Sequence, residues 1–418
     1  MKKNTVIDFE NPGEIFHDQL SELLRSKARD ILSEALELEV ESFMEEYKTY
    51  RLTDGRQRIV RHGYHQERFI QTGLGSVIAR VPRSKDRQSH SSKEPIRFSS
   101  NLIPPYLRRS KSIETLIPWL YLKGISTGGF HEALEAILGK GAPGLSAATV
   151  SRLKSIWQED WNQWKLRDLS KSKYVYFWVD GIYCNVRMDK DKQCLLVIVG
   201  VKENGEKELV SLQDGYRESS QSWMEVLLDL KQRGLKEAPK VAVGDGAMGF
   251  WKALKTVFSQ TREQRCWMHK TGNILNYLPK REQPNAKERI HQIWMAISKE
   301  EAFRALDNFV VIYDAKFPKA TQCLLKDKET LMTFYDFPAE HWRHLRTTNP
   351  IESTFATVRL RTAKVRGCFS RTTVLTMAFK LMLSAQKNWI RLHGFKKLAE
   401  VIEGVQFVDG IAENRIAA

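Results

Sequence analysis

Three acidic residues have the types and the spacing that metal-dependent phosphate chemistry requires. Asp180 ends an apolar run at 174–179, and Asp245 ends a second apolar run at 241–244. Glu352 lies at the start of an arginine-rich helical pattern. Carboxylates of two-metal sites hold two divalent cations about 4 Å apart, beside the attacking and the leaving oxygen of a phosphodiester. Because Mg²⁺ prefers oxygen ligands, we expect Asp180, Asp245 and Glu352 to bind two Mg²⁺ or Mn²⁺ ions.

Each aspartate is followed by a glycine, Gly181 or Gly246, which would let a phosphate backbone approach closely. Either Asp-Gly pair alone is also typical of an ordinary turn at the end of a strand. The Asp-Asp-Glu order, the strand contexts and the basic helix together favour the catalytic interpretation.

The charge distribution indicates a polyanionic partner. The 418-residue chain has a formal net charge of +16. Residues 51–112 contain 14 Lys/Arg and 4 Asp/Glu, whereas residues 1–50 contain 6 Lys/Arg and 12 Asp/Glu. Residues 341–371 contain 7 Lys/Arg, with Glu352 as their one acid. Blocks of like charge usually mark interaction regions, and the alternative is a solvated basic surface that serves solubility.

Composition also excludes some classes of protein. The chain contains no run of about 18 apolar residues, and its first residues lack an apolar signal core. Its 5 cysteines do not have the spacing of a disulfide framework. We therefore expect a cytoplasmic protein with reduced thiols.

The elements before the first aspartate are expected to bind DNA. Residues 14–48 have the helical spacing of an acidic amphipathic helix suited to packing or self-association. Residues 62–85 predict a β-hairpin, and residues 84–100 predict a polar, serine-rich linker. The basic side chains expected to contact DNA from the hairpin are Arg61, Arg68, Arg80 and Arg83.

A second DNA-binding element is predicted between 107 and 165. A helix at 130–138 is followed by a glycine-rich break at 139–144, and Ser146 then caps a helix that carries Arg152 and Lys154. This arrangement is typical of a helix-turn-helix. An ordinary helical hairpin is the alternative, and the sequence does not distinguish them.

The pattern changes to strands at residue 174. Strands are expected at 174–179, 194–201, 207–213 and 240–244, with helices at 219–233 and from Met248. This β-β-β-α-β-α order predicts an α/β fold with a ribonuclease-H-like mixed sheet and helices on both faces. Because 107 residues separate Asp245 from Glu352, a helical insertion is expected between them.

The predicted organisation has six parts. They are an acidic helical segment at 1–60 with a possible role in oligomerisation, a basic hairpin and linker at 61–100, a helix-turn-helix-like region at 101–170, the first part of the core at 171–265, a helical insertion at 266–345, and the completion of the core with C-terminal helices at 346–418.

The residues around the second aspartate form a specific signature. Asp245 is followed by Gly249 and Phe250, and then by Gln264, Cys266 and His269. This Asp-x₃-Gly-aromatic and Gln-x-Cys-x₂-His pattern resembles that of the mutator-type transposases, the IS256 family of bacterial insertion sequences. Residues 347–353 (Thr-Thr-Asn-Pro-Ile-Glu-Ser) resemble the glutamate block of that family. Gly181, where the family often has Ala, and Ser259 are small departures, and the resemblance extends over about residues 60–400.

The resemblance implies a DDE transposase with Asp180, Asp245 and Glu352 as catalytic metal ligands. Such an enzyme nicks double-stranded DNA at the terminal inverted repeats, and the freed 3′ hydroxyls attack target DNA without a covalent protein intermediate. A homodimer or higher oligomer is expected, because two transposon ends must be joined in one complex.

Cys266 and His269 supply only half of a structural zinc site, so zinc is not expected. We interpret them as a strand-borne pair that supports the active site, together with Asn349. Basic residues after Glu352 are expected to clamp the DNA backbone, and they are Arg359, Arg361, Lys364 and Arg366.

Two other functions remain open. One is a nuclease of the same fold that only hydrolyses DNA, and the other is a non-catalytic DNA-binding protein descended from a transposase. The presence of all three acids argues against the second.

Overall fold

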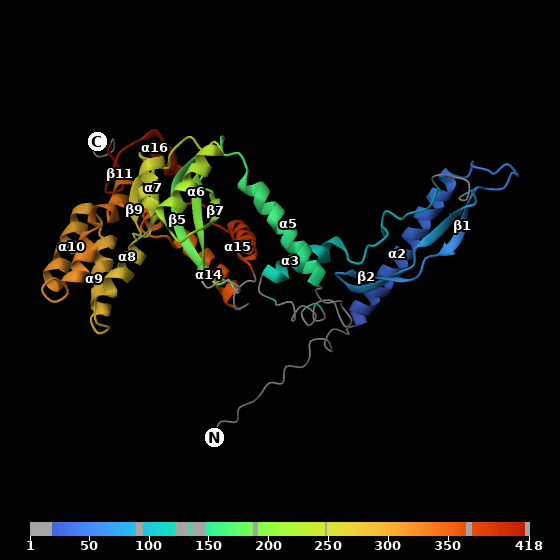
Figure 1. Ribbon diagram of the computed structural model, residues 1–418, viewed down its shortest axis with the longest axis horizontal. Coiled ribbons are helices and arrows are strands. Elements are labelled where there is room, and N and C mark those ends of the chain that lie inside the picture. The colour runs from blue at the N-terminus through green and yellow to red at the C-terminus, as the bar shows by residue number, and fades with distance from the viewer. Residues whose placement is uncertain are drawn as a thin grey trace, which may run out of the picture. The chain divides into compact units, whose positions relative to one another are not determined.

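The computed structural model describes residues 19–88, 95–122, 125, 134, 147–186, 191–246, 249–364 and 370–413. The chain divides into two units, Met1–Leu153 and Lys154–Ala418, and each is described by itself. Figure 1 shows the elements of both units. The boundaries of the six parts that the sequence predicts stay predictions.

The first unit is built on helix α2 (Gln19–Glu46) and four strands. Strands β2 (Arg68–Thr72) and β3 (Gly75–Ala79) form an antiparallel hairpin, as predicted. Strands β1 (Ile59–Tyr64) and β4 (Pro82–Asp86) form a second antiparallel pair. The core of this unit joins α2 to the strands through buried apolar side chains, which are Leu36, Ile70, Ala79, Val81 and Ile103.

The predicted linker at 84–100 was wrong in its first residues, because Ser84–Asp86 belong to β4, whereas the predicted strand region at 62–85 correctly included Ser84 and Lys85. The side chains of Ser84 and Asp86 are buried. Ser84 Oγ accepts a hydrogen bond from the amide of Phe98 at 2.7 Å. Asp86 accepts two hydrogen bonds from Arg58, at 3.0 and 2.9 Å. Buried hydrogen bonds replace apolar contacts here, so the polar composition concealed a strand. The serine-rich residues 89–94 lie outside the described residues.

Helices α3 (Lys111–Leu122) and α5 (Ala147–Lys165) follow in the chain. Leu153 of α5 belongs to one apolar cluster with Ile113 and Ile117 of α3. The predicted helix at 130–138, apart from Leu134, lies outside the described residues, as do the break at 139–144 and Ser146. The helix-turn-helix therefore stays a prediction.

The second unit contains a five-stranded mixed sheet of order β7-β6-β5-β8-β9. Its strands are β5 (Tyr174–Cys184), β6 (Gln193–Lys202), β7 (Lys207–Gly215), β8 (Val241–Gly244) and β9 (Arg262–Arg265). The first three pair antiparallel, whereas β8 pairs parallel to β5 and β9 pairs parallel to β8. With α6 (Ser220–Gln232) and α7 (Phe250–Val257), the predicted β-β-β-α-β-α order is confirmed, and the sheet is the mixed one expected of a ribonuclease-H-like core.

Strand β9 was not predicted. Its sequence, Arg-Glu-Gln-Arg, contains no apolar residue, and only Gln264 is buried. The Gln264 side chain accepts a hydrogen bond from the amide of Phe334 at 2.7 Å and donates to the carbonyl of Leu331 at 3.1 Å. Side-chain hydrogen bonds to the following helical region, rather than hydrophobic burial, hold this strand in the sheet.

Helices cover both faces of the sheet (Figure 1). On one face, Trp223 of α6 and Phe250 of α7 are fully buried against Phe177 and Val179 of β5. The alternate side chains of β5 face the other layer, where the Trp178 indole donates to the carbonyl of His344 at 2.8 Å. Helix α14 (Asn349–Lys364) contacts β5, and α15 (Arg371–Gln386) contacts both α14 and β7.

The chain between β9 and α14 is helical, as predicted. Its elements are α8 (Trp267–Leu275), α9 (Gln283–Met295), α10 (Lys299–Tyr313), α11 (Pro318–Leu325), α12 (Lys328–Leu331), the 3₁₀ turns η1 (Thr333–Asp336) and η2 (Ala339–His341), and α13 (Trp342–Leu345). After α15 come η3 (Phe395–Lys397), α16 (Leu398–Glu403) and a ribbon of β10 (Phe407–Val408) and β11 (Ile411–Ala412). Within the described ranges, no helix has the length and apolar character to cross a membrane.

Candidate active site

Asp180 lies within β5 rather than at its end, which corrects the predicted strand of 174–179. Antiparallel pairing with β6 continues past Asp180 to Cys184. Parallel pairing with β8 ends earlier, at Trp178. Asp180 therefore sits beside the point where β8 ends, and its side chain is 7% exposed.

Asp245 follows β8 directly, as predicted, and two side chains hold its backbone. The indole of Trp251 donates to the carbonyl oxygen of Asp245 at 2.7 Å. The guanidinium of Arg265 reaches the carbonyl oxygens of Asp245 and Gly246 at 3.4 and 3.3 Å, and it lies 4.2 Å from the ring centroid of Trp251. These contacts fix the position of the loop that carries the second acid.

Glu352 lies in the first turn of α14, as predicted. The hydroxyl of Thr348, one helical turn earlier, donates to Glu352 Oε1 at 2.7 Å. Nδ1 of His269 lies 3.9 Å from the same oxygen. The backbone amide of Thr348 donates to Cys266 Sγ at 3.4 Å. Thr348 thus joins Glu352 to the Cys266–His269 pair.

The Cys266–His269 pair is helix-borne, so its predicted place on a strand was wrong. Strand β9 ends at Arg265, and Cys266 is the N-cap of α8, whose first turn carries His269. The amide of Cys266 donates to the carbonyl of Gly244 at 2.8 Å, which ties the start of α8 to the end of β8. The pair therefore faces both Glu352 and the strand that leads to Asp245.

The acids and His269 interact electrostatically. The pKa of Asp180 is raised to about 6, first by burial and also by the carboxylates of Glu352 and Asp245, while His269 opposes this shift. The pKa of His269 is raised to about 9, first by its hydrogen bond to Cys266 and then by Asp245 and Asp180. Repulsion among carboxylates brought together from β5, β8 and α14 is what a divalent cation would relieve.

The donor chemistry fits a divalent cation. Asp180, Asp245 and Glu352 offer the carboxylate oxygens that Mg²⁺ and Mn²⁺ prefer. Ligand atoms of Cys266, His269 and Glu352 also lie within 4.8 Å of one another. That trio falls one ligand short of a four-ligand structural zinc site in the described part of the chain.

The remaining predicted residues of this region are exposed, or their side chains lie outside the described atoms. Asn349 is exposed at the start of α14, and Thr348 rather than Asn349 contacts Glu352. Arg359 is exposed on α14, with its guanidinium 5.7 Å from the Phe355 ring centroid. Arg361 and Lys364 belong to α14, but their side chains lie outside the described atoms, as does the whole of Arg366.

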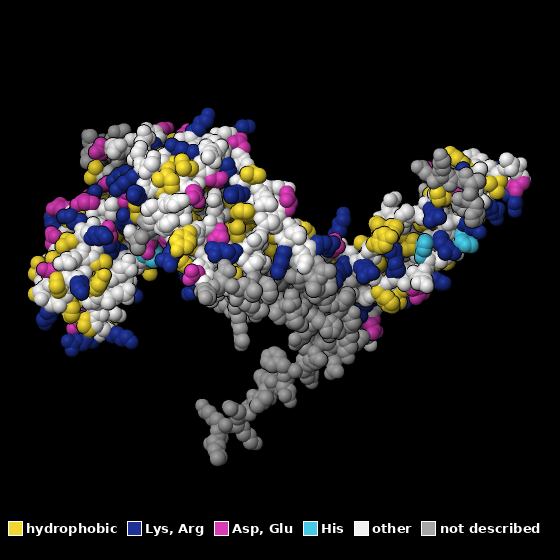
Figure 2. Space-filling view, in the orientation of Figure 1, with side chains coloured by type: hydrophobic (Ala, Val, Ile, Leu, Met, Phe, Trp, Pro, Cys, Tyr) yellow, Lys and Arg dark blue, Asp and Glu magenta, His cyan; other side chains and the backbone are white. Residues whose placement is uncertain are grey.

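The predicted DNA contacts of the first unit are surface residues with different surroundings. Arg80 and Arg83 are exposed, whereas Arg61 is paired with Glu37 and Arg68 is half-buried. Figure 2 shows Lys, Arg and His side chains close together on the visible face of this unit. On α5, Arg152 is exposed and lies 4.0 Å from Glu114, and Lys154 is half-buried.

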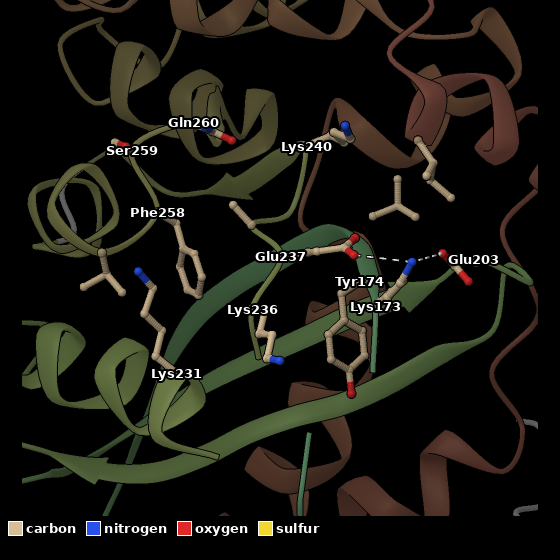
Figure 3. Close-up of a pocket in the computed structure, with 14 residues that line it drawn as sticks. Lys173, Tyr174, Glu203, Lys231, Lys236, Glu237, Lys240, Phe258, Ser259 and Gln260 are labelled. Carbon is tan, nitrogen blue, oxygen red and sulfur yellow. Dashed lines mark ion pairs between the residues drawn. The ribbon is translucent and has the colours of Figure 1, made fainter. Parts of the chain in front are cut away.

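A cavity of about 460 Å³ lies at the other end of β5 and β8 (Figure 3). It is lined by Lys173 just before β5, by Lys240 just before β8, and by Lys231 and Lys236. Lys173 forms ion pairs with Glu203 and Glu237. Asp180 lies farther along β5 and Asp245 follows the far end of β8, so this cavity is separate from the candidate active site.

Sequence reasoning missed three residues that position the acids, which are Trp251, Arg265 and Thr348, and it missed Glu218, whose carboxylate interacts electrostatically with Asp180 and Asp245. Thr348 lies in the glutamate block at residues 347–353, so its position next to Asn349 was the available signal. Glu218 precedes the N-cap of α6 and shows no pattern of its own.

A sequence model described as "Transposase, Mutator family" matches residues 1–392. The transposase of insertion sequence IST2 from Acidithiobacillus ferrooxidans is 49% identical over 284 residues, covering 68% of this chain and 96% of that protein. The IS6120 transposase of Mycolicibacterium smegmatis is 50% identical over 295 residues, covering 71% and 91%. The IS256 transposase of Staphylococcus aureus is 26% identical over 373 residues, covering 87% and 91%.

Among solved structures, the catalytic domain of the Mos1 mariner transposase matches 45% of this chain and 93% of its own. The sequence identity is 14% and the TM-score is 0.16. The fold assignment rests on the strand order and directions described above rather than on this score.

Proposed function

Because this chain belongs to the Mutator family of transposases, we propose that it cuts DNA at the terminal inverted repeats of an insertion sequence and joins the freed 3′ hydroxyls to target DNA. One observation carries the catalytic part of this proposal. Asp180, Asp245 and Glu352 come from three separate elements, and the two other acids act on the pKa of Asp180. Asp180, Asp245 and Glu352 are the proposed ligands of two Mg²⁺ or Mn²⁺ ions.

Bound divalent cations would supply Lewis acidity to the scissile phosphate and to the attacking oxygen. The protein supplies the positions of its ligands. Trp251 and Arg265 hold the Asp245 loop, and Thr348 orients the Glu352 carboxylate. His269, whose raised pKa keeps it protonated at neutral pH, provides a positive charge beside Glu352 and a donor for a phosphate oxygen.

DNA binding is assigned to the basic residues of the first unit and to helix α14, which carries Glu352. Arg80 and Arg83 are exposed on and beside the β-strands of that unit. Arg359 lies on the helix of the third acid. Guanidinium groups at these places would contact phosphates and hold the duplex without reading its sequence.

We also assign a dimer or higher oligomer to the active form, because two transposon ends must be joined in one complex. Helix α2 presents an exposed apolar stripe at a spacing of seven residues, formed by Leu24, Ile31 and Leu38. This spacing suits pairing with a second helix. Light scattering of the full chain, with and without transposon-end DNA, measures the assembly directly.

The test of the reaction uses purified protein, Mg²⁺ or Mn²⁺, and labelled DNA that carries the ends of the element. We expect metal-dependent nicks at the terminus, followed by products joined to target DNA. A pre-cut oligonucleotide with a free 3′ hydroxyl separates the two enzymatic functions. Joined products support the transposase, whereas hydrolysis without joining would identify a nuclease of the same fold.

A further inference from the structure

Glu218 lies at a junction of the two elements that carry the aspartates. It immediately precedes Ser219, the N-cap of α6, whose side chain accepts a hydrogen bond from the amide of Ser222. The backbone carbonyl of Glu218 accepts a hydrogen bond from the amide of Gly249 at 2.9 Å. The segment before α6 is thereby fixed to the chain that follows Asp245.

The side chain of Glu218 occupies the space that Gly181 leaves beside Asp180. A Cβ atom placed on Gly181 would lie 2.6 Å from Cδ and Oε1 of Glu218. Gly181 is absent from the glycines with positive φ, so backbone conformation does not demand a glycine there. The space taken by the Glu218 carboxylate explains why residue 181 has no side chain.

Two further contacts direct this carboxylate. Tyr183, two residues along β5 from Gly181, interacts electrostatically with Glu218. Asp180 and Asp245 both act electrostatically on Glu218, and so does His269. The side chain is half-buried, so its negative charge is close to the other acids and only partly solvated. A carboxylate in that position adds to the repulsion among the negative charges, which a bound cation would relieve.

We propose that Glu218 is a fourth carboxylate of the active site and strengthens divalent-cation binding beside Asp180 and Asp245. The inference rests on the proposed function, because it takes the metal site as given. It assigns a role to Gly181 as well, since a larger residue there would displace the carboxylate. The competing explanation is a structural one, in which Glu218 only orients Tyr183 and the N-terminus of α6.

The experiment measures Mn²⁺ binding to the full-length protein without DNA, from the loss of the free-Mn²⁺ signal in electron paramagnetic resonance. Glu218→Gln keeps the shape of the side chain and removes its charge. We expect its Mn²⁺ affinity to fall at least tenfold. Gly181→Ala, which needs only a shift of a flexible side chain, is expected to weaken Mn²⁺ binding in the same direction.

Glu225→Gln is the matched control, because Glu225 is exposed on the same helix and accepts a hydrogen bond only from Gln221 in the contacts described for it. It should bind Mn²⁺ as the wild type does. Thermal unfolding of each variant separates loss of metal affinity from loss of the fold. If Glu218→Gln fails to fold, Gly181→Ala decides the question.

Glu352→Gln and Asp245→Asn in the same titration separate the two levels of the proposal. Weak binding in these variants with wild-type binding in Glu218→Gln and Gly181→Ala would overturn the role of Glu218 and leave the proposed function intact. Unchanged Mn²⁺ binding in all of them would overturn both.

Discussion

Thr348 tests whether the Cys266–His269 pair and the third acid work as one unit. Its hydroxyl donates to Glu352 Oε1 at 2.7 Å, while its amide donates to Cys266 Sγ at 3.4 Å. The hydroxyl also lies 3.5 Å from His269 Nδ1. Thr348→Val removes the hydroxyl, and with it the contacts to Glu352, His269 and Cys266 Sγ that the hydroxyl makes, but it keeps the branched side chain and the amide bond to Cys266.

The expected effect follows from the strength of a hydrogen bond to a charged group, about 1.5–3 kcal/mol. If Thr348 holds Glu352 in its reactive orientation, this energy is lost from the transition state. Each 1.36 kcal/mol corresponds to a factor of ten in rate, so cleavage should slow by roughly 10- to 150-fold. Thr348 is fully buried, so the variant should also lose about 1 kcal/mol of folding stability.

The assay is single-turnover cleavage of a labelled transposon end at saturating protein and metal. Thr376→Val is the matched control, because Thr376 is 1% exposed and its hydroxyl donates to the carbonyl of Thr372 within α15. It should lose comparable stability without loss of cleavage rate.

A Thr348→Val protein that cleaves at the wild-type rate would refute the reasoning, since Glu352 would then need no orienting hydroxyl. Equal slowing of both threonine variants would also refute it, because general loosening of the fold rather than the contact to Glu352 would be responsible.

Three other predictions concern DNA binding, stability and pH. Log affinity for DNA falls with log salt concentration, and replacing Arg80 and Arg83 by alanine should make this slope shallower by about 2. Fluorescence anisotropy with duplex DNA measures it. Arg58→Met should destabilise the first unit by roughly 3 kcal/mol, since it leaves the Asp86 carboxylate buried and unpaired, and hydrogen exchange in β1–β4 reports this loss. The Arg58 hydrogen bonds lower the pKa of Asp86 to about 2, so the stability that this pair contributes is present above pH 4 and is lost as the pH falls through about 2. The pKa of His269 is raised from its ordinary value of 6.5 to about 9, so protonated His269 stabilises the metal-free protein fully below pH 6.5. This contribution to stability should decline as the pH rises from 6.5 to about 9. His269→Gln should remove that decline in a series of melting temperatures, and an unchanged decline would contradict the assignment.

The three acids were accessible from the sequence because each lies beside a strong local signal. Asp180 and Asp245 adjoin apolar runs that become buried strands, and Glu352 opens a helix. These signals depend on neighbours in the chain, so no knowledge of tertiary contacts was needed. The same reasoning predicted the central strands and the helical character of the chain between β9 and α14.

The wrong predictions concern residues whose structure depends on tertiary contacts rather than on the local sequence pattern. Strand β9 is polar and is held by the hydrogen bonds of Gln264, so periodicity gave no sign of it. Because that strand ends at Arg265, Cys266 and His269 belong to a helix instead. Asp86 was predicted to be a linker residue because its half-buried partner, Arg58, is distant in the chain.

The missed site residues share the same cause. Thr348 contacts Cys266 across 82 residues of sequence, and Glu218 meets Gly181 from a different element. A carboxylate before a helix cap is commonplace in a sequence. Its proximity to Asp180 and Asp245 becomes visible only when the sheet is assembled.

The most direct test of the central claim is single-turnover cleavage by Asp180→Asn, Asp245→Asn and Glu352→Gln, with Glu225→Gln as the exposed control. Each change keeps the size of the side chain and removes a metal-binding charge. We predict that all three slow metal-dependent cleavage more than about 100-fold while they still bind transposon-end DNA, and that the control cleaves as the wild type does. Near-normal cleavage by any one of the three would contradict the account, because that acid would then not belong to the catalytic site.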